Sequence, residues 1–127
     1  MTSLKGKKIL LVDDEAAIRE LLKDEFLLLG ATVEEAGGGR VALEMVKAGD
    51  YDAVITDAKM PEGDGLELAV AICRLERRQP KIFLCSGLSP CDIENTAASC
   101  IDTIFEKPLD FEKITSVVAA SLVELAS

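Results

Sequence analysis

Short apolar runs alternate with longer stretches of helical periodicity along the whole chain, and this alternation constrains the fold more than any other feature. The runs with the length and composition of strands cover residues 8–12, 31–36, 53–56, 82–85 and 103–106. The stretches with helical spacing of apolar residues cover 15–29, 41–47, 66–77, 89–99 and 111–126. Near-continuous apolar strands are typical of parallel strands that are buried on both faces. The pattern therefore predicts an α/β fold with a doubly wound, five-stranded parallel sheet.

The length and the net charge of the chain limit the number of domains and the kinds of partner that we expect. The chain has 127 residues, of which 49% are hydrophobic, and this suits one domain but not two ordinary ones. We therefore expect a single domain over residues 1–127. With 14 Lys and Arg against 23 Asp and Glu, the net charge is −9, which disfavours binding to nucleic acid or to an anionic membrane. Neither a bilayer-spanning run nor a signal peptide is visible, so we expect a cytoplasmic protein.

The chain contains no histidine, and its four cysteines show no C-x-x-C spacing. A zinc site is therefore not expected, and the cysteines are interpreted as buried or half-buried thiols in a reducing compartment. The absence of histidine also excludes reactions that depend on an imidazole base, including serine and cysteine triads.

Four of the five predicted strands end on a polar or charged side chain. The residues at these ends are Asp13, Asp14, Asp57, Ser86 and Lys107. In open parallel sheets, ligands bind outside the carboxyl ends of the strands, so we expect these side chains to share one site. The second predicted strand ends at Ala36 and Gly37 and adds no obvious functional group.

The chemistry of these residue types indicates phosphoryl transfer. Three carboxylates in one crevice repel one another unless a cation neutralises them, and Mg²⁺ takes oxygen ligands while keeping positions free for phosphate oxygens. A metal, the Lys107 ammonium and the Ser86 hydroxyl around Asp57 predict a site in which Asp57 is the nucleophile. Each residue alone has an ordinary alternative, because a strand-end aspartate is often a helix cap and a lysine is usually a solvated charge. Their joint occurrence at four strand ends favours the site.

The motifs around these residues resemble the receiver domains of two-component response regulators, over about residues 7–125. They read I-L-L-V-D-D-E, V-I-T-D-A-K-M-P-E-G-D-G, F-L-C-S-G and F-E-K-P-L. The resemblance implies the flavodoxin-like (βα)5 receiver fold with Asp57 as the phosphoacceptor. It implies that Asp13 and Asp14 form an acidic pocket for Mg²⁺ or Mn²⁺, with Asp57 and the main-chain carbonyl of Lys59 as further ligands.

The same resemblance implies the remaining roles at the site and the partners. Ser86 would be the switch hydroxyl, Lys107 the counter-charge of the phosphoryl group, and the peptide bond before Pro108 would be cis. The chain would be a signalling phosphoacceptor that catalyses its own phosphorylation and autodephosphorylation. Its donor would be a histidine kinase or histidine phosphotransfer protein, and a downstream target protein would recognise the phosphorylated state. The sequence leaves a homodimer open.

The chain departs from the receiver pattern at Ile104, three residues before Lys107, where receivers usually carry Tyr or Phe. Strand alternation places Ile104 and Phe105 on opposite faces of the sheet, so Phe105 is expected in the core and cannot replace the switch aromatic. This departure keeps one alternative open, a degenerate receiver that acts as an interaction module without phosphorylation. A haloacid-dehalogenase-like phosphatase is disfavoured, because its general-acid aspartate would stand at Lys59.

Overall fold

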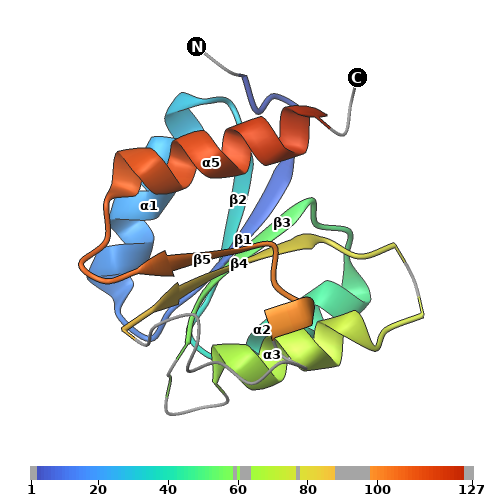
Figure 1. Ribbon diagram of the computed structural model, residues 1–127. Helices are drawn as coiled ribbons and strands as arrows, with labels where there is room; N and C mark the ends of the chain where they lie inside the picture. Colours follow the sequence, from blue (N-terminus) through green and yellow to red (C-terminus); the bar gives the residue numbers. More distant parts are fainter. Residues whose placement is uncertain (1–2, 59, 61–63, 77, 88–97, 125–127) are drawn as a thin grey trace.

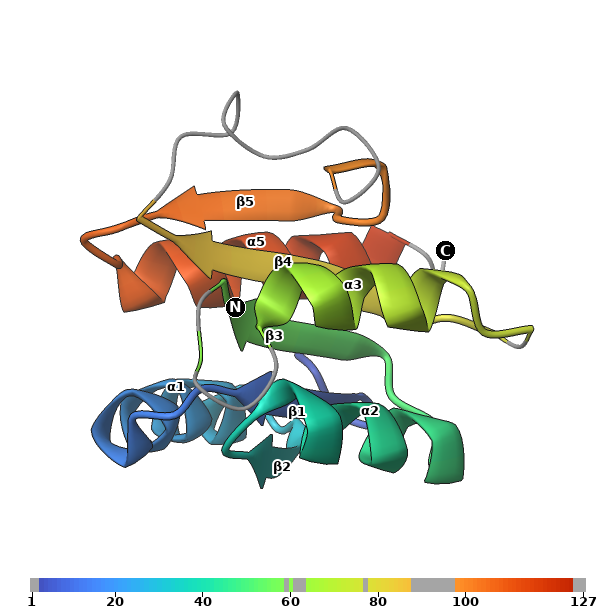
Figure 2. The same ribbon diagram turned by 90° about the horizontal axis from the view of Figure 1, so that it is seen from below.

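The computed structural model describes residues 3–58, 60, 64–76, 78–87 and 98–124. Within these residues, parallel strands form one sheet in the order β2-β1-β3-β4-β5, as Figure 2 shows. The strands are β1 (Lys8–Val12), β2 (Thr32–Ala36), β3 (Ala53–Asp57), β4 (Lys81–Ser86) and β5 (Thr103–Glu106). The helices are α1 (Ala16–Leu28), α2 (Gly39–Ala48), α3 (Gly65–Cys73) and α5 (Phe111–Glu124). Helices α1 and α5 cover one face of the sheet, and α2 and α3 cover the other (Figure 1). The predicted doubly wound α/β fold is confirmed.

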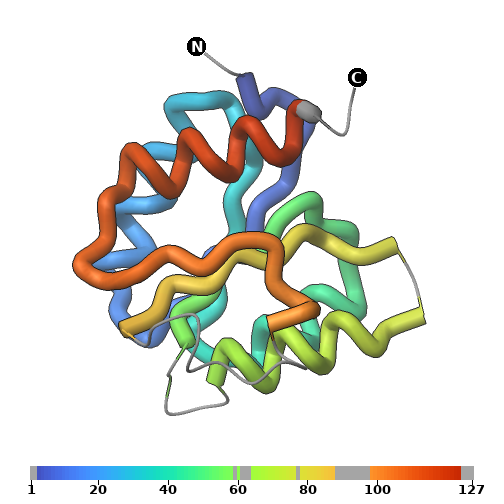
Figure 3. The backbone as a smooth tube through the Cα atoms, viewed as in Figure 1, coloured from blue at the N-terminus to red at the C-terminus, as the bar shows by residue number. Residues whose placement is uncertain are grey.

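The strand order positions the site. The chain runs outward from β1 to β2 and then returns past β1 to β3 (Figure 3). The direction of winding therefore reverses between β1 and β3, and a crevice opens at the carboxyl ends of strands at such a point. The register keeps these ends level, because Val12 is opposite Thr56 and Asp57 is opposite Cys85. Residues that directly follow β1 and β3 therefore lie side by side.

Two apolar layers form the core, one on each face of the sheet. On the α1 and α5 face, Ile9 and Leu11 of β1 pack in one cluster with residues of both helices. On the opposite face, Leu10 and Val12 pack with residues of α2 and α3. Strand β1 therefore alternates between two buried faces, which explains why its sequence is an uninterrupted apolar run.

Ile104, at the position where receivers usually carry an aromatic residue, and its neighbour Phe105 lie on opposite faces of the sheet, as predicted. Phe105 is buried with an exposed fraction of 6%, and its ring stacks on Phe83 with the ring centroids 6.3 Å apart. Ile104 packs on the other face, in the cluster that contains Ala58 and Leu84. Phe105 is thus a core residue, and an aliphatic side chain occupies the position where receivers usually carry an aromatic one.

The residues at the start of α5 and at the ends of α1 and α3 can be compared with the predictions. Asp110 caps α5 as predicted, since its carboxylate accepts from the Lys113 amide at 3.1 Å. Gly30, with a φ of +93°, ends α1. The helix predicted over 66–77 is shorter than expected and ends at Cys73. The side-chain amide of Gln79 donates to the carbonyl oxygens of Cys73 and Leu75, at and just beyond this end.

Two further predictions concern a helix over 89–99 and the burial of the cysteines. The helix predicted over 89–99 falls largely on residues 88–97, which lie outside the described residues. The cysteines were expected to be buried or half-buried, and Cys85 and Cys100 are, but Cys73 is exposed at the last residue of α3. Cys91 lies outside the described residues. Among the described helices, none combines the length and the apolarity that crossing a bilayer requires.

Candidate functional site

Three aspartates meet at the carboxyl edge of the sheet, where the sequence predicts a site. Asp57 is the last residue of β3, and Asp13 and Asp14 directly follow β1. One carboxylate oxygen from each lies within 4.8 Å of the others. Asp13 and Asp57 are buried, with exposed fractions of 9% and 8%, whereas Asp14 is exposed. The cluster therefore has two buried carboxylates and one open to solvent.

Asp13 is fixed by hydrogen bonds on both its main chain and its side chain. Its main-chain amide donates to the carbonyl oxygen of Ala36 at 3.2 Å, and its Oδ1 accepts from the main-chain amide of Glu15 at 2.9 Å. Burial raises the pKa of Asp13 to about 6, because the ionised carboxylate loses hydration. The hydrogen bond from Glu15 opposes this rise, and the negative charges of Asp57 and Asp14 add to it.

Lys107 provides the positive charge of the site. Its Nζ lies 2.8 Å from Oδ1 of Asp57, and this contact raises the pKa of the ammonium, so Lys107 is charged at neutral pH. The main-chain amide of Lys107 donates to the carbonyl oxygen of Ser86 at 2.9 Å, which ties the end of β5 to the end of β4. The peptide bond from Lys107 to Pro108 is cis.

Ser86 and Cys85 form the end of β4 beside Asp57. Ser86 is fully buried, and Cys85 is opposite Asp57 in the sheet. Burial, with the negative charges of Asp57 and Asp13, raises the pKa of the Cys85 thiol to about 12. The thiol is therefore protonated in the metal-free fold, and Ser86 contributes a hydroxyl at this strand end.

Gly65 is a site residue to which sequence reasoning assigned no role. A Cβ at this position would lie 2.1 Å from the main-chain oxygen of Asp57, so only glycine allows the start of α3 to return against the end of β3. The amide of Gly65 donates to the carbonyl oxygen of Ala58 at 2.9 Å, and Asp64 caps α3 through the amide of Glu67 at 2.8 Å. The signal was present as the D-G pair in the quoted motif. Lys59, predicted to give a main-chain ligand, lies outside the described residues.

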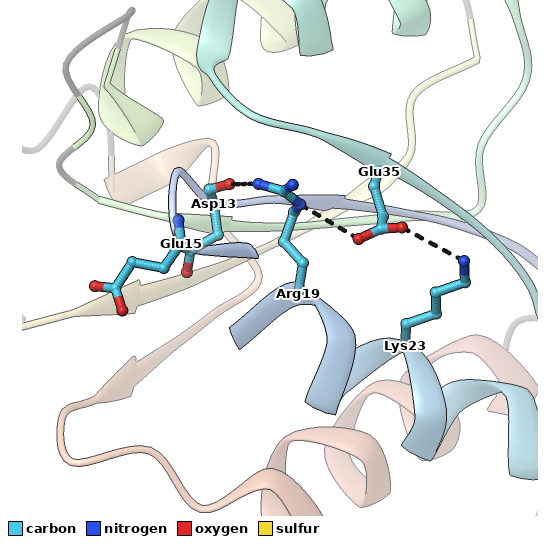
Figure 4. Close-up of polar contacts among 5 residues, drawn as sticks. All are labelled: Asp13, Glu15, Arg19, Lys23 and Glu35. Atoms are coloured by element: carbon cyan, nitrogen blue, oxygen red, sulfur yellow. Dashed lines mark hydrogen bonds and ion pairs between the residues drawn. The ribbon is translucent and has the colours of Figure 1, made fainter. Parts of the chain in front are cut away.

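Sequence reasoning also missed an arginine that contacts the site from α1. Figure 4 shows the guanidinium of Arg19 donating to the main-chain oxygen of Asp13 and pairing with the carboxylate of Glu35. Lys23 pairs with the other oxygen of the same carboxylate. Glu35 belongs to β2, so the second strand, whose end adds no obvious functional group, contacts Arg19 through an earlier residue. A strand-end pattern does not reveal this contact.

The donor set fits a hard divalent cation. The three clustered aspartates offer only carboxylate oxygens, which are the ligands that Mg²⁺ prefers. Their three negative charges face a single ammonium, that of Lys107, among the site residues described. A cation with two positive charges would relieve the repulsion that this excess creates.

Comparison with known proteins agrees with this chemistry. The profile of the response regulator receiver domain matches residues 9–119. Regulator of RpoS from Escherichia coli K12 is 32% identical over 120 residues, which are 94% of this chain and 36% of that protein. This chain thus spans about a third of that relative.

Solved structures share the fold. The response regulator TrrA from Thermotoga maritima, in complex with Mg²⁺ and BeF, is 35% identical with a TM-score of 0.79, covering 91% of this chain and 98% of that one. TrrA in complex with the histidine kinase ThkA matches with a TM-score of 0.78 and 35% identity, covering 91% of this chain and 97% of that one. From its fold, its acidic cluster and these matches, this chain belongs to the response regulator receiver domain family of two-component systems.

Proposed function

We propose that this receiver accepts a phosphoryl group on Asp57 in an Mg²⁺-dependent reaction and that phosphorylation switches its contacts with other proteins. One observation carries the proposal. The buried carboxylate of Asp57 lies 2.8 Å from the Lys107 ammonium and, at the same time, within 4.8 Å of carboxylate oxygens of Asp13 and Asp14. A nucleophile, a counter-charge and a cation pocket are thereby combined in one crevice.

Different residues of the chain have separate roles in the phosphoryl transfer. A carboxylate oxygen of Asp57 forms a bond to phosphorus as the bond from phosphorus to the donor nitrogen breaks, and the nitrogen of the departing imidazole keeps that electron pair. Asp13, Asp14 and Asp57 would hold the cation, and the resemblance to receivers implies that the main-chain carbonyl of Lys59 would be a further ligand. When bound, Mg²⁺ supplies positive charge for the oxygens of the transferring group. Lys107 offsets further charge on the same oxygens, and the Ser86 hydroxyl donates to one of them.

The donor in this proposal is a histidine of a kinase or phosphotransfer protein, because the chain has no histidine of its own. The structure of TrrA with a histidine kinase supports this class of partner. The net charge of −9 favours protein targets over nucleic acid. We place the reaction in the cytoplasm, with residues 1–127 acting as one receiver unit. The chain is thus a signalling phosphoacceptor, which catalyses its own phosphorylation and autodephosphorylation.

Phosphorylation would alter the local charge enough to bias a switch. It replaces the single charge of Asp57 with a group of about −1.5 to −2 and adds acceptor oxygens. Lys107 would then exchange its carboxylate partner for phosphoryl oxygens, and Ser86 would supply the hydroxyl at the neighbouring strand end. The target face comprises β5, α5 and the helix expected over 89–99. A second copy of the chain is a further candidate for this face.

One observation favours a second candidate, a degenerate receiver that binds partners without phosphorylation. Ile104 replaces the usual aromatic residue and packs against Leu84 and Ala58, so the response that the aromatic normally provides has no direct equivalent. The three aspartates and the ion pair from Lys107 to Asp57 favour phosphorylation instead.

Intact mass spectrometry tests the choice. The protein is incubated with Mg²⁺ and acetyl phosphate, beside an Asp57→Asn variant and a sample treated with EDTA. We expect one phosphoryl group on the wild type and none on the variant or the chelated sample. Failure to label the wild type, under conditions that label another receiver, would favour the degenerate module.

A further inference from the structure

Arg19 contacts three parts of the fold with one side chain, in addition to the main-chain bond from Asp13 to Ala36. It lies in the second turn of α1 with 20% of its side chain exposed. Its Nη1 donates to the main-chain oxygen of Asp13, beyond the end of β1, and its Nε lies 3.3 Å from Oε1 of Glu35 in β2 (Figure 4). One side chain therefore connects α1, the acidic loop and the neighbouring strand.

The contact with Asp13 satisfies a carbonyl at the point where the chain leaves the sheet. Strand β1 ends at Val12, so the carbonyl of Asp13 lies past the last residue of the strand. The amide of Asp13 is bonded to Ala36 and its Oδ1 to the amide of Glu15, and the guanidinium of Arg19 takes the carbonyl. These bonds together define the orientation of the peptide unit between Asp13 and Asp14.

We propose that Arg19 is a positioning residue for the metal pocket, acting through the main chain of Asp13, and that Glu35 holds Arg19 in place. The inference rests on the proposed function, because it concerns the same pocket. Turning the peptide unit after Asp13 would move the carboxylate of Asp14 relative to those of Asp13 and Asp57. Arg19 contacts none of these carboxylates in the described contacts, so its positioning effect passes through the backbone of Asp13.

The shape of the guanidinium explains why this position requires arginine. Two different nitrogens serve the two partners, Nη1 for the carbonyl of Asp13 and Nε for the carboxylate of Glu35. A planar fork can make both bonds at once in fixed directions, whereas a lysine offers a single ammonium on a flexible stem. Pairing with Glu35 also offsets the positive charge of Arg19, which would otherwise oppose cation binding nearby.

The direction of the change in Mg²⁺ affinity distinguishes positioning from simple electrostatics. If Arg19 acted only as a charge, Arg19→Gln would strengthen Mg²⁺ binding, since a repelling cation is removed. If it positions the loop, the same substitution weakens binding, by about tenfold if it resembles the loss of other groups that orient metal ligands. Arg19→Lys keeps the charge but loses the fork, so we expect it to bind Mg²⁺ more weakly than the wild type too.

The experiment is isothermal titration of Mg²⁺ into the wild type, Arg19→Gln, Arg19→Lys, Glu35→Gln and Lys23→Gln, well below each unfolding midpoint. Lys23→Gln is the matched control, because Lys23 pairs with the same carboxylate of Glu35 at 3.4 Å and is not bonded to Asp13. We expect its dissociation constant to stay within about twofold of the wild type, whereas Glu35→Gln weakens binding by about threefold or more.

The outcomes are distinct. A lower unfolding midpoint with an unchanged Mg²⁺ dissociation constant in Arg19→Gln would assign Arg19 a purely structural role and overturn the inference. If Arg19→Gln does not fold, Glu35→Gln decides, and an unchanged dissociation constant there overturns it equally. A wild type that binds no Mg²⁺ would refute the proposed function itself. A wild type that binds Mg²⁺ no better than Arg19→Gln refutes the positioning role alone.

Discussion

Asp13 carries a charge that the metal-free fold accommodates at a cost, so Asp13→Asn should stabilise the protein when no cation is present. Burial raises its pKa from 3.8 to about 6, and each pKa unit corresponds to about 1.4 kcal/mol. The ionised side chain therefore opposes folding by at most about 3 kcal/mol at neutral pH. Partial solvation at the open edge of the site reduces this figure, and we expect a gain of about 1–2 kcal/mol. The asparagine keeps an acceptor oxygen for the Glu15 amide.

The stability that Asp13→Asn gains over the wild type should depend on pH in a direction that the pKa shift defines. A carboxyl whose folded pKa is raised keeps its proton longer in the folded state than in the unfolded state. Well below about pH 4 both states are protonated, and this carboxyl has no effect on the stability of the wild type. As the pH rises from about 4 to 6 the unfolded state ionises first, and the stability of the wild type falls; above about 6 the penalty is constant. The advantage of Asp13→Asn should therefore grow through this window and then level off.

Urea unfolding followed by circular dichroism measures the effect, with EDTA present, at about pH 7.5 and about pH 5. Asp24→Asn is the control, because Asp24 is an exposed carboxylate of α1 and a change there alters stability by less than about 0.5 kcal/mol. Excess Mg²⁺ should remove the advantage of Asp13→Asn, since the ion stabilises only a fold that binds it. If Asp13→Asn is no more stable than the wild type at the higher pH in EDTA, the reasoning is wrong.

Three further substitutions test the site and its supports. Lys107→Gln removes the ammonium that lies 2.8 Å from Asp57 and should slow labelling by acetyl phosphate about tenfold or more, measured by a time course of intact mass; an unchanged rate would show that the charge is not needed. Gly65→Ala places a Cβ 2.1 Å from the main-chain oxygen of Asp57 and should lower the free energy of unfolding by about 3 kcal/mol or more, and a neutral result in urea would contradict the close approach. Asp110→Ala removes the cap of α5 and should cost about 1 kcal/mol in the same assay, whereas Asp110→Asn should retain most of the stability.

Patterns within one segment were sufficient to predict most of the fold. Strands β1 and β5 begin and end where the apolar runs do, because a strand buried on both faces tolerates few polar residues. The meeting of Asp13, Asp14 and Asp57 followed from topology alone, since parallel strands bring their carboxyl ends to one edge. Helix α3 was predicted too long, because the apolar spacing of the sequence continues to Leu75 whereas the helix ends at Cys73.

The remaining features depend on contacts between segments that periodicity does not encode. Arg19 and Glu35 are 16 residues apart and meet only because β2 lies beside β1 under α1. Taken alone, the sequence around each residue indicates only a solvated charge on the surface of its own helix or strand. The close approach at Gly65 likewise needs the path of the chain between β3 and α3. A sequence pattern locates groups along one element, whereas these contacts arise from how elements pack.

Phosphorylation of Asp57 is tested most directly by locating the phosphoryl group itself. The wild type is labelled with acetyl phosphate and Mg²⁺, reduced with borohydride, which converts an aspartyl phosphate to homoserine, and digested for peptide mass spectrometry. We expect homoserine at position 57 in the wild type, at no other aspartate, and none when EDTA is present. Homoserine at Asp13 or Asp14, or at position 57 without any divalent cation, would contradict this expectation.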